Sequence, residues 1–148
     1  MDLELVEDAS PRAPSALRIG RAIVASADHR NRRRGEAYSG RLPTQADFAA
    51  MRDAYAGVAP DPAHFDEIAK KVPAMVGAWP GWSDEEIRQI DVPVLVMIGD
   101  TDFILVPDAA ETAELLPQGQ LAVLPDHSHM DMIGSDLVTQ VAKRFLRQ

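Results

Sequence analysis

The segment Val92–Asp131 constrains the fold of this chain more than any other stretch. It contains two apolar runs, Val92–Ile98 and Gln120–Leu124, with a predicted helix between them. In a parallel strand-helix-strand unit both strands point the same way, so their carboxyl ends lie at the same edge of the sheet. Ligands bind at that edge in open α/β sheets, which makes the polar residues after the two runs candidates for a functional site.

Those polar residues include an acid and a histidine. The first group is Gly99-Asp100-Thr101-Asp102, and the second is the loop Leu124–His129. A histidine changes its charge near neutral pH. In a catalytic triad it takes the proton of the nucleophile, while the acid fixes its tautomer and stabilises the imidazolium. The spacing of the two groups therefore predicts an aspartate-histidine pair at this edge.

The segment resembles the C-terminal part of the α/β-hydrolase fold. In that family V-P-V-L-V-x-x-G-x-x-D carries the triad acid after a late strand, and L-P-x-x-x-H carries the triad histidine after the last strand. The matching positions here imply that Asp102 is the acid and His129 the histidine, with Asp100 as a competing acid. The implied class is α/β: a partial α/β-hydrolase fold, in which helices and a helical lid insertion accompany a short parallel sheet.

The nucleophile of that family is missing from the sequence. It stands in a G-x-S-x-G turn between a strand and a helix, and no serine here has both flanking glycines. In the family this turn precedes the strand that matches Ile19–Ala27, so we expect it before Met1 and interpret the chain as a truncated or split hydrolase. An open edge of that first strand would invite association. We therefore expect a homo-oligomer or a complementary chain there, and light scattering that finds a monomer at high concentration would contradict this.

Composition excludes several classes of function. The 148 residues carry a net charge of −8 and include no cysteine. The chain is long enough for one ordinary domain with a sizeable core. The negative charge argues against nucleic acid and anionic membranes as partners, and no run approaches the ~20 apolar residues of a membrane span. The acidic N-terminus does not have the pattern of a signal peptide, so the expected location is cytoplasmic.

The sequence divides into three predicted segments. Residues 1–40 hold an N-terminal tail, a strand and a loop of the core, residues 41–90 a helical lid, and residues 91–148 the C-terminal βαβα part of the core. Thr44 and Ser83 are predicted N-caps, with Asp47 and Glu86 at the reciprocal capping-box positions. A last helix from Ser135 to Arg147 is expected to turn a set of apolar residues inward: Leu137, Val138, Val141, Phe145 and Leu146.

Two further features allow a functional or a structural interpretation. Trp79 and Trp82 lie at the end of the predicted lid and are candidates for substrate binding, although packing between lid and core explains such tryptophans more often. The arginines of the loop Asp28–Gly40 could contact an anion or an acidic substrate, or they could lie on a solvated loop. These arginines are Arg30, Arg32, Arg33 and Arg34.

A metal site is the weaker alternative for the histidine loop. His127-x-His129-x-Asp131 is similar to the ligand run of metallo-β-lactamase-like hydrolases, but Met132 stands where that family continues with a histidine. Only His29 and His64 remain elsewhere and cysteine is absent, so a zinc site is hard to complete. We predict no metal and no cofactor.

The resemblance implies a serine hydrolase of the esterase type, acting on a small ester or acyl substrate in its complete form. The alternative is a non-catalytic half-fold that serves as an interaction or remnant domain, because the nucleophile turn is missing. Fold analogy does not identify the substrate.

Overall fold

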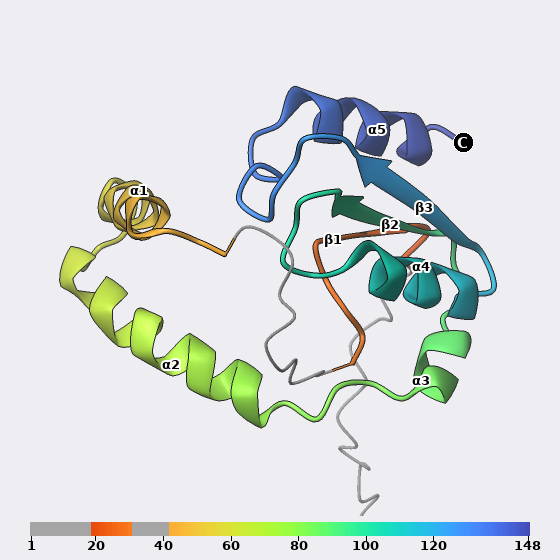
Figure 1. The fold of residues 1–148 in the computed structure, drawn as a ribbon, viewed down its shortest axis with the longest axis horizontal. Helices are drawn as coiled ribbons and strands as arrows, with labels where there is room; N and C mark the ends of the chain where they lie inside the picture. Colours follow the sequence, from red (N-terminus) through yellow and green to blue (C-terminus); the bar gives the residue numbers. More distant parts are fainter. Residues whose placement is uncertain (1–18, 31–41) are drawn as a thin grey trace, which may run out of the picture.

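The computed structural model describes residues 19–30 and 42–148 and is a parallel sheet with helices on both faces (Figure 1). Its elements in chain order are β1 (Ala22–Ala25), α1 (Gln45–Ala56), the 3-10 turn η1 (Pro62–His64), α2 (Phe65–Ala78), α3 (Asp84–Arg88), β2 (Val94–Gly99), α4 (Val106–Leu115), β3 (Gly119–Leu124) and α5 (Asp136–Leu146). The predicted α/β class with a short parallel sheet is confirmed. None of the helices among these residues has the length and apolar character that crossing a membrane requires.

The three strands lie in the order β1-β2-β3 and are all parallel. Ala22 pairs with Val94 at the start of β1, and Gly99 pairs with Leu124 at the end of β2. The central strand β2 is buried along its whole length, as expected for a parallel strand covered on both faces. Within the described residues β1 has no second neighbour, so one of its edges is unpaired.

Alternate residues of β2 face two separate apolar clusters, because side chains along a strand point to opposite faces. Val94, Val96 and Ile98 pack with Ile87 of α3 and with residues of α4. Leu95 and Met97 pack with Phe145 of α5 and with Leu124 and Met132. Figure 1 shows the same arrangement, with α3 and α4 on one side of the sheet and α5 on the other.

The first strand is shorter than the sequence predicted. Pairing begins at Ala22, whose N–H bonds to the carbonyl of Pro93, and Ile19 remains 66% exposed. The strand ends at Ser26, which has a φ of 53° and so turns the chain out of extended geometry. The pairing with β2 fixes where β1 begins, and the turn at Ser26 fixes where it ends. The pattern of apolar residues in the sequence reveals neither.

The helix α1 has its predicted N-cap, the N-cap of α2 makes no side-chain hydrogen bond, and neither helix has a buried residue. Thr44 and Asp47 form the expected capping box, and Asp61 accepts a hydrogen bond at the start of η1. The two helices lie apart from the sheet in Figure 1. Several of their apolar side chains are exposed: Phe48, Val72, Met75 and Val76.

The helix α3 differs from α1 and α2 because it contributes to the core. Its capping box of Ser83 and Glu86 is present as predicted, and Ile87 is 6% exposed within the cluster on the α4 face. The division of the chain at residues 40 and 90 stays a prediction.

The inward-facing set of α5 was predicted only in part. Phe145 is buried, and Val138 and Val141 pack against the same cluster. Leu137 and Leu146 were expected to face inward but are 37% and 56% exposed. Val138, Val141 and Phe145 are spaced three and four residues apart, so they share the face of α5 that contacts the core. The two leucines lie outside that face.

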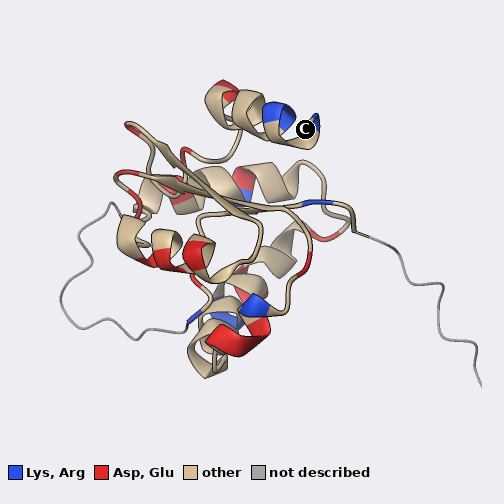
Figure 2. Cartoon of the chain, turned by 90° about the vertical axis from the view of Figure 1, so that its right-hand side faces the viewer, with Lys and Arg blue, Asp and Glu red and all other residues tan. Residues whose placement is uncertain are grey.

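The charged side chains of α5 are arranged by the two ends of the helix. Figure 2 shows acidic positions on several elements and blue positions on the helix that ends near the C-terminus. In α5 the acidic residue Asp136 lies in the first turn, and Lys143 and Arg144 lie in the last. This distribution complements the helix dipole.

Candidate active site

The structure brings Asp102 and His129 together at the carboxyl edge of the sheet. His129 Nδ1 lies 3.2 Å from Asp102 Oδ1. The Asp102 side chain is fully buried, whereas 30% of the His129 side chain is exposed. Asp102 follows β2 and His129 follows β3, so the parallel order of the strands places both residues at one edge. The resemblance to the α/β-hydrolase fold implied this pair by residue number, with Asp100 as the competing acid.

The two loops that carry the pair are tied together by backbone hydrogen bonds. Asp100 N–H bonds to the Leu124 carbonyl at 3.0 Å, and Thr101 N–H bonds to the His127 carbonyl at 3.1 Å. A Cβ at Gly99 would lie only 2.0 Å from the His127 carbonyl oxygen. Glycine at this position therefore allows the close approach that brings the histidine loop to the acid.

The surroundings of Asp102 keep it ionised. Burial raises the pKa of this carboxyl, but hydrogen bonds from His129, Ser26 and the Ile104 N–H lower it by more, so the net shift is downward. Asp102 Oδ1 accepts from Ile104 N–H at 2.9 Å, and Oδ2 accepts from Ser26 Oγ at 2.6 Å. Hydrogen bonds to the charged form of an acid favour that form.

The ionised acid also fixes the protonation of His129. A carboxylate only accepts hydrogen bonds, so Nδ1 of His129 must carry the proton that it shares with Asp102. In the neutral ring Nε2 is then the acceptor, and within the described ranges no hydrogen-bond partner lies against it. Phe103 stacks on the imidazole with ring centroids 4.2 Å apart. The pair can therefore hold a proton acceptor in one tautomer and one orientation.

The competing candidates have other partners. Asp100 is exposed and accepts a hydrogen bond from the His127 N–H, so it does not contact His129. His127 bonds through its two ring nitrogens to the Pro125 carbonyl and the Ser135 hydroxyl. Asp131 accepts from the backbone and side chain of Ser128. The described residues contain no group of three or more His, Cys, Asp or Glu side chains that could hold a metal ion together.

The two tryptophans lie against each other, with ring centroids 4.8 Å apart and an edge-to-face orientation. Trp82 is 55% exposed, and its N–H bonds to the His29 carbonyl at 2.8 Å. It lines a cavity of about 420 Å³ between the sheet, α3 and α4, to which neither Asp102 nor His129 contributes. Substrate binding by Trp79 and Trp82 stays a prediction, and this cavity is separate from the acid-histidine pair.

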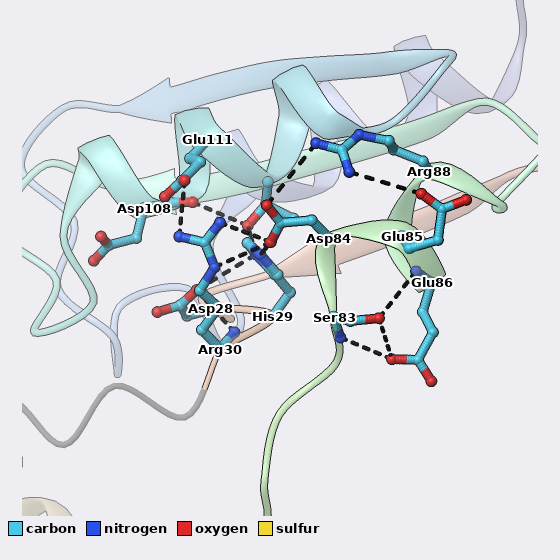
Figure 3. Close-up of polar contacts among 11 residues, drawn as sticks. Asp28, His29, Arg30, Ser83, Asp84, Glu85, Glu86, Arg88, Asp108 and Glu111 are labelled. Atoms are coloured by element: carbon cyan, nitrogen blue, oxygen red, sulfur yellow. Dashed lines mark hydrogen bonds and ion pairs between the residues drawn. The ribbon is translucent and has the colours of Figure 1, made fainter.

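The loop after β1 forms a second polar cluster, which the sequence did not predict (Figure 3). The ring of His29 lies 2.8 Å from Thr112 Oγ1 and 3.3 Å from Asp84 Oδ1. Arg30 forms ion pairs with Asp84 at 2.7 Å and Glu111 at 2.8 Å. The cluster therefore ties the β1 loop to α3 and α4.

The charge of Arg30 is matched by these carboxylates, and the hydrogen bond from Arg30 is the main cause of a lowered pKa at Asp84. Of the predicted arginine cluster, Arg30 thus serves as an internal ion-pair partner. Arg32, Arg33 and Arg34 lie outside the described residues.

Comparisons with known proteins identify the fold. No protein-family model matches this chain, and neither does any curated protein. Among solved structures, a bromoperoxidase from Bacillus anthracis matches with a TM-score of 0.58 and 17% identity over 88% of this chain and 59% of its own. The meta-cleavage product hydrolase CumD from Pseudomonas fluorescens IP01 matches with a TM-score of 0.53 and 17% identity, over 86% and 56% of the two chains.

A thermophilic esterase from Thermogutta terrifontis is similar to the same degree, with a TM-score of 0.52, 18% identity, and coverage of 86% of this chain and 56% of the esterase. The chain thus spans slightly more than half the length of the structures it matches. The similarity extends over most of this chain. The chain accordingly has part of the α/β-hydrolase fold.

Proposed function

We propose that this chain is the acid-and-histidine part of a serine hydrolase of the esterase type, acting on a small ester or acyl substrate. The observation that carries the proposal is the contact between buried Asp102 and partly exposed His129 at the carboxyl edge of the sheet. The structures with the same fold include a hydrolase and an esterase, which supports the reaction class.

The chemistry assigns one role to each residue. Asp102 accepts a hydrogen bond from His129 Nδ1–H and stabilises positive charge on the ring, so that Nε2 can take a proton from a nucleophile. In the complete enzyme that nucleophile would be a serine in a G-x-S-x-G turn, which this sequence does not contain. Without it the pair can still act as a general base toward water, which is the activity that this chain can be tested for.

The test is turnover of p-nitrophenyl acetate by the purified chain and by three variants. We expect His129→Ala to lower the turnover rate by about 100-fold or more, the usual contribution of a general base. Asp102→Asn should lose most of the same turnover, because the tautomer of the His129 ring is no longer fixed. His64→Ala is the matched control, since His64 is exposed in η1 and has no role in the pair.

Equal rates in all four proteins would contradict catalysis by the pair. The second candidate, a non-catalytic half-fold with a partner at the unpaired edge of β1, would then be favoured. Light scattering on the same preparation distinguishes a second copy of the chain from a monomer that awaits another partner.

A further inference from the structure

Ser26 occupies a conformation that most residues avoid. It follows the last residue of β1 and has a φ of 53°, in the left-handed region where a Cβ comes too close to the following carbonyl oxygen. Its N–H still bonds to the carbonyl of Met97 in β2 at 2.9 Å, so the turn is anchored to the sheet. Strained backbone of this kind collects at functional sites when the surrounding structure fixes it.

The turn directs the Ser26 hydroxyl to the acid of the candidate site. Ser26 Oγ lies 2.6 Å from Asp102 Oδ2, and because the carboxylate only accepts, the hydroxyl must donate. The other oxygen, Oδ1, accepts from His129 and from the Ile104 N–H. Among the described residues Ser26 is thus the side chain that holds Oδ2, in a position where the carboxylate is fully buried.

The same geometry excludes Ser26 as the missing nucleophile. Its proton is donated to Asp102, whereas a nucleophilic serine donates to the free nitrogen of the histidine. Val24 and Asp28 stand at the positions where a nucleophile turn has its two glycines. Ser26 touches the acid only, so it would act through Asp102.

We infer that Ser26 is a positioning residue, whose hydroxyl clamps Oδ2 of Asp102 so that Oδ1 stays directed at His129. Only the effect of Ser26 on catalysis rests on the proposed function. The Ser26 hydroxyl restrains the Asp102 carboxylate whether or not the chain is catalytic. A carboxylate that is held at only one oxygen could rotate about its Cβ–Cγ bond. Three points then fix it: the Ser26 hydroxyl, the Ile104 N–H and the His129 ring.

Two substitutions separate the hydroxyl from the backbone strain. Ser26→Gly removes the hydroxyl but suits a positive φ, whereas Ser26→Thr keeps a hydroxyl but places a β-branched side chain in the left-handed region. The readout is the pH titration of the Asp102 carboxyl carbon and the His129 ring, followed by nuclear magnetic resonance on the whole chain. Urea unfolding of the same proteins measures stability.

We expect Ser26→Gly to shift the Asp102 titration to higher pH, because the ionised acid loses a donor, and to lose at neutral pH the stability that this shift implies. Ser26→Thr should titrate as the unaltered chain does while losing stability. A glycine variant that titrates like the unaltered chain would overturn the inference, and so would glycine and threonine variants that shift together. The titration needs no turnover, so an inactive chain would refute the proposed function without touching this result.

Discussion

Two histidines of this chain each lie against an aspartate, with opposite burial. His29 Nε2 is 3.3 Å from Asp84, and His129 Nδ1 is 3.2 Å from Asp102. The side chain of His29 is 1% exposed and that of Asp84 39%, whereas His129 is 30% exposed and Asp102 is completely buried. The distances are almost equal, so distance alone does not show which of the two pairs could take part in proton transfer.

The second nitrogen of each ring makes the difference. Thr112 donates its hydroxyl proton to the Asp108 carbonyl, so the Oγ1 that faces His29 Nδ1 is an acceptor. Both nitrogens of His29 therefore have polar partners within the fold. His129 has one nitrogen held by a buried acid and the other without a partner among the described residues. A histidine with both ring nitrogens in hydrogen bonds stabilises the fold. A histidine with one ring nitrogen outside any hydrogen bond can accept or donate a proton there.

The comparison predicts the largest loss of stability at His29. We expect His29→Ala to lower the free energy of unfolding by about 2–4 kcal/mol, because it leaves a cavity and removes a buried hydrogen-bond partner of Thr112. His129→Ala should cost less, about 1–2 kcal/mol, because its ring is partly exposed and the buried Asp102 carboxylate keeps the Ser26 and Ile104 donors. Urea unfolding measures both, with His64→Ala as the exposed control. A larger loss at His129 than at His29 would break the comparison.

A smaller, pH-dependent effect is expected at Asp102. The folded state lowers the pKa of this carboxyl below its ordinary value of 3.8, so the ionised acid stabilises the fold above that value. This contribution is lost as the pH falls through the folded-state pKa. Asp102→Asn should be less stable than the unaltered chain by about 1–2 kcal/mol at neutral pH.

The difference between the two proteins should shrink as the pH falls below about 4. Unfolding curves at pH 7, 5, 4 and 3 test the sign, and taking the difference cancels the other acids with lowered pKa values: Asp47, Asp84 and Glu86. A gap that stays constant across this range would mean that the charge of Asp102 does not contribute to stability.

The smallest effect is expected at the ion pair between Arg30 and Glu111. Their side chains are 30% and 40% exposed, so solvent screens the attraction and side-chain ordering offsets much of it. In a double-mutant cycle of Arg30→Gln and Glu111→Gln, the coupling should be weak and should fall further at high salt. A strong coupling that ignores salt would show that Arg30, rather than His29, dominates this cluster.

Local sequence patterns predicted most of the elements and the acid-histidine pair. Capping boxes at Thr44 and Ser83 marked helix starts that the structure confirms. The pair was predictable because parallel strands on either side of one helix bring the residues after them to one edge. The strand order predicts only that an acid and a histidine meet at this edge, and the resemblance to the α/β-hydrolase fold implied Asp102 and His129 for these roles.

What only the tertiary structure decided are contacts between distant segments. Ser26 meets Asp102 across 76 positions and His29 meets Thr112 across 83, and no local pattern marks these side chains as partners. The left-handed turn at Ser26 and the exposure of Leu137 and Leu146 on α5 likewise depend on how neighbouring elements pack. Sequence periodicity records which face of an element is apolar. Which residue of another element lies opposite a given side chain is fixed only when the sheet and its helices pack together.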